Sequence, residues 1–199
     1  MVKISFSGIS GSGKTSLQNE VKKILSLKYR VVSVDEINAR NPYDADKKSS
    51  FISQFFYIST QINEENIHAS NPVDYLLCDR SVFDQWIYWK DYLMSKEMNP
   101  SLEEKNKLLE HLYRFWVKTY DLIFLVRLDE QYLDSREFNK EFRKVDRNYI
   151  SKMEKLYLDI AGDDQLKMVE IWNNKSVDES AHEIIETISD FQPPAGYAG

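Results

Sequence analysis

Two hydrophobic patterns alternate along the chain. Short apolar runs rich in β-branched residues predict strands, whereas longer stretches with apolar residues at every third or fourth position predict amphipathic helices. The expected strands span residues 2–6, 29–34, 74–78, 121–126 and 166–171. The expected helices span residues 15–27, 47–68, 81–94, 103–117, 131–160 and 177–191, with a loop around 136–144 interrupting the fifth.

The alternation of strands and helices predicts the fold class. Right-handed crossovers between successive strands produce a parallel sheet with helices on both faces. Residues 74–78 form a nearly continuous apolar run, which is typical of a strand buried on both faces. We therefore expect an α/β protein of three layers with a five-stranded parallel sheet. It would form one domain over residues 1–191, followed by an unstructured tail over 192–199.

Capping and breaking residues limit the longer helices. Ser81 is expected to cap helix 81–94, and Pro72 and Pro100 are expected to break the chain before the strand and the helix that follow them. The apolar side chains near one face of helix 47–68 are Phe51, Phe55, Ile58, Ile62 and Ile67.

Residues 8–15 carry the strongest chemical signal in the chain. Their sequence, Gly-Ile-Ser-Gly-Ser-Gly-Lys-Thr, matches G-x-x-x-x-G-K-[ST] at every fixed position, between an expected strand and an expected helix. Backbone N–H groups of such a loop, together with the helix N-terminus, cradle a phosphate chain. Lys14 would reach the β- and γ-phosphates, and the Thr15 hydroxyl would bind Mg²⁺.

Charged residues follow the second and third expected strands. Because ligands bind beyond the carboxyl ends of parallel strands, Asp35, Glu36, Asp79 and Arg80 are expected at the same edge as the glycine-rich loop. Asp79 would support Mg²⁺ opposite Thr15. A carboxylate after the second strand would face the acceptor and take a proton from an attacking hydroxyl. Acidic residues at strand ends also serve as solvated side chains or helix caps.

Three arginines follow the fourth expected strand, namely Arg136, Arg143 and Arg147. A cationic segment that closes over a transferring phosphoryl group supplies charge and excludes water, so we expect a lid at about residues 134–148. Acidic residues are interleaved with these arginines, and the segment also fits a solvated helix face with i,i+4 ion pairs.

Composition narrows the class of protein. A net charge of −6 argues against broad electrostatic binding to nucleic acid. No apolar run is long enough to span a membrane, and no room precedes the first strand for a signal peptide, so we expect a cytoplasmic protein. The single cysteine, Cys78, excludes an intramolecular disulfide and is expected to be a buried, inert thiol.

The chain resembles the P-loop nucleoside and nucleotide kinases, especially the deoxynucleoside kinase and thymidylate kinase group. Residues 8–17 resemble the phosphate loop of deoxynucleoside kinases. Asp79-Arg80-Ser81 and the residues up to 88 are similar to that family's Glu-Arg-Ser segment and to the Asp-Arg segment of thymidylate kinases. Residues 51–57 are similar to the helix that carries a base-reading glutamine, and residues 123–157 to the family's last strands and lid helix.

The resemblance implies a set of site residues. Catalysis would involve Lys14, Glu36, Arg80 and Arg143. ATP would be bound by Gly8, Ser10, Gly11, Ser12, Gly13, Lys14, Thr15, Ser16, Arg136 and Arg147. The acceptor would be bound by Asp35, Gln54, Tyr57, Arg80 and Asp84, and Mg²⁺ by Thr15 and Asp79. Because isoleucine follows Glu36 where the family commonly has proline, Asp35 stays an alternative working carboxylate.

Three functions are open at this point. The first is an ATP- and Mg²⁺-dependent kinase that acts on a deoxynucleoside or deoxynucleotide. The second keeps the chemistry but phosphorylates a hydroxymethylated pyrimidine, such as 5-hydroxymethyluracil, in viral DNA, with the aromatic helix segment 86–92 holding the unstacked base. The third is a P-loop ATPase or nucleotide-binding module without a small acceptor. The resemblance also implies a homodimer, through segment 86–92 or helix 103–117.

Overall fold

The chain folds around a parallel sheet of five strands in the order β2-β3-β1-β4-β5. The structure is a computed structural model that describes residues 1–37, 40–43, 50–129 and 147–191. The strands are β1 (Val2–Ser7), β2 (Val31–Val34), β3 (Tyr75–Asp79), β4 (Leu122–Arg127) and β5 (Met168–Trp172). The helices are α1 (Lys14–Leu25), α2 (Phe51–Ala69), α3 (Val82–Met94), α4 (Pro100–Val117), α6 (Arg147–Asp163) and α7 (Val177–Ser189). The predicted fold class and all five predicted strands are confirmed.

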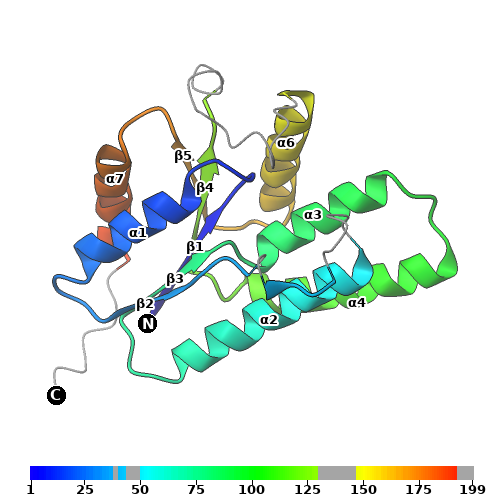
Figure 1. The fold of residues 1–199 in the computed structure, drawn as a ribbon, viewed down its shortest axis with the longest axis horizontal. Helices are drawn as coiled ribbons and strands as arrows, with labels where there is room; N and C mark the ends of the chain where they lie inside the picture. The colour runs from blue at the N-terminus through cyan, green and yellow to red at the C-terminus, as the bar shows by residue number, and fades with distance from the viewer. Residues whose placement is uncertain (38–39, 44–49, 130–146, 192–199) are drawn as a thin grey trace.

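Helices cover both faces of the sheet, so the protein has three layers (Figure 1). On one face, α1 and α7 pack side by side against alternate residues of the strands, such as Ile4 and Phe6 of β1. On the other face, α2, α3, α4 and α6 enclose the second core, which contains Cys78 and most of the buried aromatic side chains. Cys78 is fully buried as expected, and burial raises the pKa of its thiol well above the ordinary value.

Two helix starts differ from the sequence-based expectation. Helix α4 begins at Pro100 rather than near residue 103, because the Asn99 side chain caps it by accepting the Leu102 N–H at 3.1 Å. Proline is well tolerated at the first helical position, so the expected break is in fact the start. Helix α2 begins at Phe51 after the cap Ser50, while residues 44–49 lie outside the described chain.

Helix α2 buries a face that its hydrophobic pattern did not indicate. Phe55 and Ile67 are 39% and 53% exposed, although both were expected on one face with Ile58, which is buried. The buried residues are mostly polar, namely Ser53, Gln54, Tyr57, Ile58, Gln61 and Glu65. Gln61 donates to Glu65 of the same helix and to the Arg80 carbonyl oxygen, and Glu65 also accepts from the Tyr120 hydroxyl. The contacts with other elements are invisible in the periodicity of one helix.

Other predictions concern residues beyond the described part of the chain. These are the lid up to residue 146 and the tail 192–199. Within the described ranges, no helix is both long and apolar enough to cross a membrane.

Candidate active site

The loop between β1 and α1, residues 8–13, lies at the carboxyl edge of the sheet and is called the glycine loop here. Gly8 has a φ of 136°, and a Cβ at this position would lie 2.5 Å from the Val126 carbonyl oxygen of β4. Gly13 caps α1 in the left-handed region, with a φ of 94°. A side chain at Gly8 would therefore push the loop off the sheet, and the first N–H groups of α1 open directly onto the loop.

Lys14 is the first residue of α1, and its side chain turns back into the glycine loop. Its Nζ donates to the Ile9 carbonyl oxygen at 2.7 Å and to Ser12 Oγ at 3.4 Å. Burial, and after it the nearby Arg80 guanidinium, lower the pKa of Lys14 from its usual range to about 7. A bound anion would favour the charged form of this amine and would therefore raise its pKa.

Thr15 and Asp79 form the candidate Mg²⁺ site. The Thr15 hydroxyl donates to Asp79 Oδ2, while Asp79 Oδ1 is buried without a hydrogen-bond partner in the described structure. Burial raises the pKa of the Asp79 carboxyl, against the opposing effects of Thr15 and Lys14. An orphaned carboxylate oxygen beside a hydroxyl fits Mg²⁺, which takes one or two protein oxygens and completes its shell with phosphates and water.

Arg80 follows β3 with a φ of 72°, a left-handed conformation that is unfavourable for a side chain of this size. Its guanidinium is buried, and Nε donates to a carboxylate oxygen of Glu36 at the end of β2. Nη1 also lies 3.4 Å from the Gly8 carbonyl oxygen and from Tyr88 Oη. Arg80 thus joins the glycine loop to Glu36, and both charged residues lie at the same edge of the sheet as the loop, as the strand-end rule predicted.

Asp84 was expected at the acceptor, but its contacts are with the protein. Oδ1 accepts the Gly8 N–H at 3.0 Å and the Tyr157 hydroxyl at 2.8 Å, and Oδ2 accepts the Ser7 hydroxyl at 2.7 Å. Oδ2 also caps α3 by accepting the Ser81 N–H at 2.9 Å. These bonds anchor the start of the glycine loop to α3 and α6, and a contact between Asp84 and the acceptor stays a prediction.

The other expected acceptor residues lie on β2 and α2. Asp35 is exposed directly after β2, whereas Glu36 beside it is the residue paired with Arg80. Gln54 is buried, and its Oε1 has no hydrogen-bond partner in the described structure. Tyr57 is also buried, with its ring edge-on to Phe56. An unsatisfied amide oxygen in a buried position is what a base-reading glutamine would present before its ligand binds.

The remaining residues expected at the site differ in exposure. Ser10, Thr15 and Ser16 are exposed at the loop and the first turn of α1, and Ser12 is buried. Arg147 is exposed at the start of α6, while Arg136 and Arg143 lie outside the described residues.

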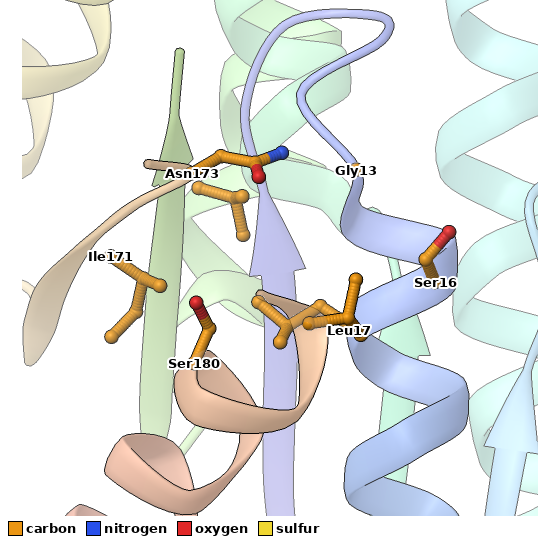
Figure 2. A pocket seen from close by; sticks show the side chains of 8 residues that line it. Gly13, Ser16, Leu17, Ile171, Asn173 and Ser180 are labelled. Carbon is orange, nitrogen blue, oxygen red and sulfur yellow. The ribbon is translucent and has the colours of Figure 1, made fainter. Parts of the chain in front are cut away.

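Asn173 is a site residue that the sequence analysis missed. Its Nδ2 donates to the Ser12 carbonyl oxygen, and Figure 2 shows its side chain turned toward the glycine loop. It lines a cavity of about 370 Å³ between α1 and α7, together with Gly13, Ser16, Leu17, Val126, Ile171, Val177 and Ser180. Asn173 directly follows β5, so the strand-end rule, which was applied only to the first four strands, would have found it.

The fold and this site together define a P-loop nucleotide-binding protein of the α/β class. The sequence model of a family described as an AAA domain matches residues 3–174, so the chain belongs to that family. No curated protein sequence shows significant similarity to the chain.

Solved structures of nucleoside and nucleotide kinases share the fold. Deoxyadenosine kinase from M. mycoides with bound dCTP aligns with a TM-score of 0.69 and 16% identity, over 95% of this chain and 100% of that one. Thymidylate kinase from Candida albicans aligns with a TM-score of 0.65 and 17% identity, over 96% of this chain and 92% of that one. Thymidylate kinase from Ehrlichia chaffeensis gives 0.64 and 19%, over 94% and 98%. The resemblance to nucleoside and nucleotide kinases is therefore confirmed at the level of the fold.

Proposed function

We propose that this protein is an ATP- and Mg²⁺-dependent kinase that transfers the γ-phosphoryl group to a deoxynucleoside or deoxynucleotide. The observation that carries the proposal is the ion pair between Arg80 and Glu36 beside the glycine loop. It puts a buried cation and a carboxylate that is 36% exposed next to the groups that would bind phosphates. A module without an acceptor has no need of this pair. The names of the structural neighbours, thymidylate kinase and deoxyadenosine kinase, support the same assignment.

The donor side uses groups that are already in place. Phosphate oxygens would accept from the loop and helix N–H groups, and Lys14 would exchange its bond to the Ile9 carbonyl oxygen for bonds to the β- and γ-phosphates. The cavity between α1 and α7 opens beside Gly13, so it would take the nucleoside end of the donor. Thr15 and Asp79 would hold Mg²⁺, which when bound neutralises charge on the phosphate oxygens.

On the acceptor side, Arg80 would stabilise the charge that develops on the transferring group. The bond between the γ-phosphorus and ADP breaks as the bond to the acceptor oxygen forms. Where the acceptor is a hydroxyl, Glu36 takes its proton. Where the acceptor is a phosphate, no base is needed, and Glu36 only orients Arg80 and the sugar.

Two observations favour a free nucleoside or nucleotide over a base within DNA. The net charge of −6 opposes binding to a polynucleotide. Trp86 and Trp89 are 3% and 0% exposed, so they belong to the core and do not offer a stacking surface for an unstacked base.

Transfer of labelled γ-phosphate from ATP to a panel of acceptors tests the proposal. The panel comprises the common deoxynucleosides, their 5′-monophosphates and an oligonucleotide that contains 5-hydroxymethyluracil. Transfer to a free nucleoside or monophosphate supports the proposal and identifies the acceptor. Transfer to the oligonucleotide alone would make the protein a DNA kinase. Fast hydrolysis of ATP with no transfer would make it an ATPase, and either result overturns the proposal.

Replacing Gln54 by leucine should raise KM for the acceptor about 10- to 100-fold, which corresponds to about 1–3 kcal/mol for a lost hydrogen bond in a buried site. KM for ATP should stay unchanged, because Gln54 lies on α2 and not at the glycine loop. Steady-state kinetics with each substrate varied in turn measures both values. Asn63→Leu, which changes an exposed amide on the same helix, is the control. An equal rise in both KM values would contradict a base-reading role.

We also propose that a second copy of the chain docks on the outer stripe of α4. This stripe consists of Glu104, Leu108, His111, Phe115 and Lys118, which are all exposed and recur at alternating spacings of four and three. Such spacing forms a continuous seam along a helix. An antiparallel pairing centred on His111 joins the apolar residues, and it sets Glu104 opposite Lys118 of the partner subunit. The stripe is thus complementary to itself in charge and in hydrophobicity.

Sedimentation equilibrium should show a mass of two 23.5-kDa chains for the wild type and of one chain for Phe115→Glu. Phe115 is 74% exposed, so its replacement should leave the melting temperature of the subunit unchanged. Glu104→Lys should weaken the dimer, and adding Lys118→Glu should restore it because the charges are then exchanged. A monomeric wild type, or a dimer that survives Phe115→Glu, would refute this interface.

A further inference from the structure

The central strand β1 carries polar side chains on one of its two buried faces. Lys3, Ser5 and Ser7 are 6%, 0% and 0% exposed and alternate with Val2, Ile4 and Phe6 of the apolar core. Ser7 belongs to the Asp84 contacts described above. Lys3 lies near the amino end of the strand, whereas the glycine loop follows its carboxyl end, and the proposed reaction does not use Lys3.

Lys3 forms a buried ion pair with Glu65 of α2. Lys3 Nζ donates to Glu65 Oε2 at 2.8 Å and to Thr119 Oγ1 at 2.6 Å. Three more donors reach the Glu65 carboxylate: Trp116 Nε1 at 2.6 Å, Gln61 Nε2 at 2.8 Å and Tyr120 Oη at 2.6 Å. We call Lys3, Gln61, Glu65, Trp116 and Tyr120 the Glu65 cluster. A buried ion pair is weak evidence for a purely stabilising role, because well-packed apolar residues of similar volume often stabilise a fold as well.

Two members of the cluster reach the backbone of residues 80–82. Gln61 uses its Nε2 for both Glu65 Oε1 and the Arg80 carbonyl oxygen, the latter at 3.4 Å. The Tyr120 hydroxyl donates to Glu65 Oε1 and accepts the Val82 N–H at 3.3 Å. The carboxylate therefore orients both side chains that hold the backbone directly after the left-handed residue Arg80.

The strained backbone of Arg80 explains why such a support is needed. A left-handed φ at a long side chain persists only where the surroundings over-determine it. The Arg80 N–H donates to the Phe6 carbonyl oxygen at 3.0 Å, which holds the residue on its amino side. Gln61 and Tyr120 hold the backbone on its carboxyl side, at the Arg80 carbonyl oxygen and at the Val82 N–H.

We propose that Glu65, acting through Gln61 and Tyr120, is a positioning residue for Arg80. This inference rests on the proposed kinase function for its effect on rate, but its structural content does not. Glu65 is buried in the core, so it would not contact phosphates or acceptor directly. Its task is to keep the backbone of residues 80–82 in the conformation that aims Arg80 at the transferring group.

Two adjacent hydroxyls of the same network provide a matched test. Tyr120→Phe removes the hydroxyl that bridges Glu65 and the Val82 N–H. Thr119→Val removes a hydroxyl whose hydrogen bonds, within the described part of the chain, are to Lys3 and to the Trp116 carbonyl oxygen. In ¹H–¹⁵N spectra, the Arg80 Nε–H bonded to Glu36 should give a resonance that Arg80→Lys removes. We expect Tyr120→Phe to shift this resonance and to speed hydrogen exchange at Val82, and Thr119→Val to change neither.

Kinetics gives the second readout. Tyr120→Phe should lower kcat between about 10- and 100-fold with little change in KM for ATP, as expected when a catalytic group is displaced by about 1 Å. The loss should vanish in an Arg80→Met background, because Tyr120 acts through Arg80. Should Tyr120→Phe fail to fold, Gln61→Met, which removes the donor to the Arg80 carbonyl oxygen, takes its place in the comparisons of the Arg80 resonance and of kcat.

The outcomes separate this inference from the proposed function. Equal effects of Tyr120→Phe and Thr119→Val on the Arg80 resonance, or a kcat loss that persists without Arg80, would overturn the positioning role and leave Glu65 as a core ion pair. If no acceptor is phosphorylated by the wild type, the kinase proposal fails. The resonance and the exchange at Val82 still decide whether Tyr120, which Glu65 orients, positions Arg80.

Discussion

Replacing Lys14 by methionine should lower kcat/KM for phosphoryl transfer about 10³-fold, because a buried cation that neutralises transition-state charge is removed while the loop backbone stays. Lys14 is the cation whose Nζ lies within the glycine loop, bonded to the Ile9 carbonyl oxygen. The acceptor assay under subsaturating ATP measures the change. Lys23→Met, which removes an exposed lysine of the same helix, should have no effect. A loss of less than tenfold for Lys14→Met would show that the loop does not deliver this lysine to the phosphates.

The depressed pKa of Lys14 gives this prediction a pH dependence. In the free protein the pKa is about 7, so the amine is mostly neutral at pH 8. Bound phosphates favour the charged amine and raise its pKa, so binding at pH 8 takes up a proton and affinity falls up to tenfold per pH unit above 7. Below pH 7 the amine is charged in both states, and this dependence disappears. Calorimetry in buffers of different ionisation enthalpy measures the uptake, which Lys14→Arg, charged throughout, should abolish.

The sequence predicts the parts of the site that depend on one segment and one rule. The spacing of its glycines, lysine and threonine identifies the glycine loop in the sequence. The strand-end rule predicts that Asp79 and Arg80 lie at the same edge of the sheet. Their observed contacts, the Thr15 hydroxyl on Asp79 and the Arg80 guanidinium on Glu36, follow from that placement. Local pattern and parallel topology are enough for these residues.

What escaped prediction depends on partners that are distant in sequence. In the sequence, Glu65 looks like a solvent-facing residue of an amphipathic helix. Its partners Lys3 and Tyr120 lie 62 and 55 positions away, so no local pattern indicates that it is buried. Asp84 looks like part of an acceptor motif, yet its oxygens are used by Ser7, Gly8 and Tyr157. The left-handed backbone of Arg80 has no sequence signature either, because it is imposed by tertiary contacts and opposes the local preference of arginine.

Replacing Arg80 by methionine should lower kcat about 10³-fold, which is the lower end of the effect of an arginine that stabilises a transferring phosphoryl group. The affinity for Mg²⁺·ATP should change by only a few-fold, because the loop, Lys14, Thr15 and Asp79 remain. Arg80→Lys should recover a small part of the rate. A lysine keeps the charge but cannot bridge Glu36 and the Gly8 carbonyl oxygen at once as the guanidinium does.

Single-turnover kinetics with the identified acceptor, beside calorimetry of ATP binding, separates these effects on rate and affinity. Arg30→Met is the matched control, because it removes an arginine that is 47% exposed and paired with Asp74 before the amino end of β2. Its activity should equal that of the wild type. A lost ATP affinity in Arg80→Met with an unchanged rate of transfer would place Arg80 on the donor phosphates alone. The acceptor side would then rest on Glu36 and Gln54, and the ion pair beside the glycine loop would no longer distinguish a kinase from an ATPase.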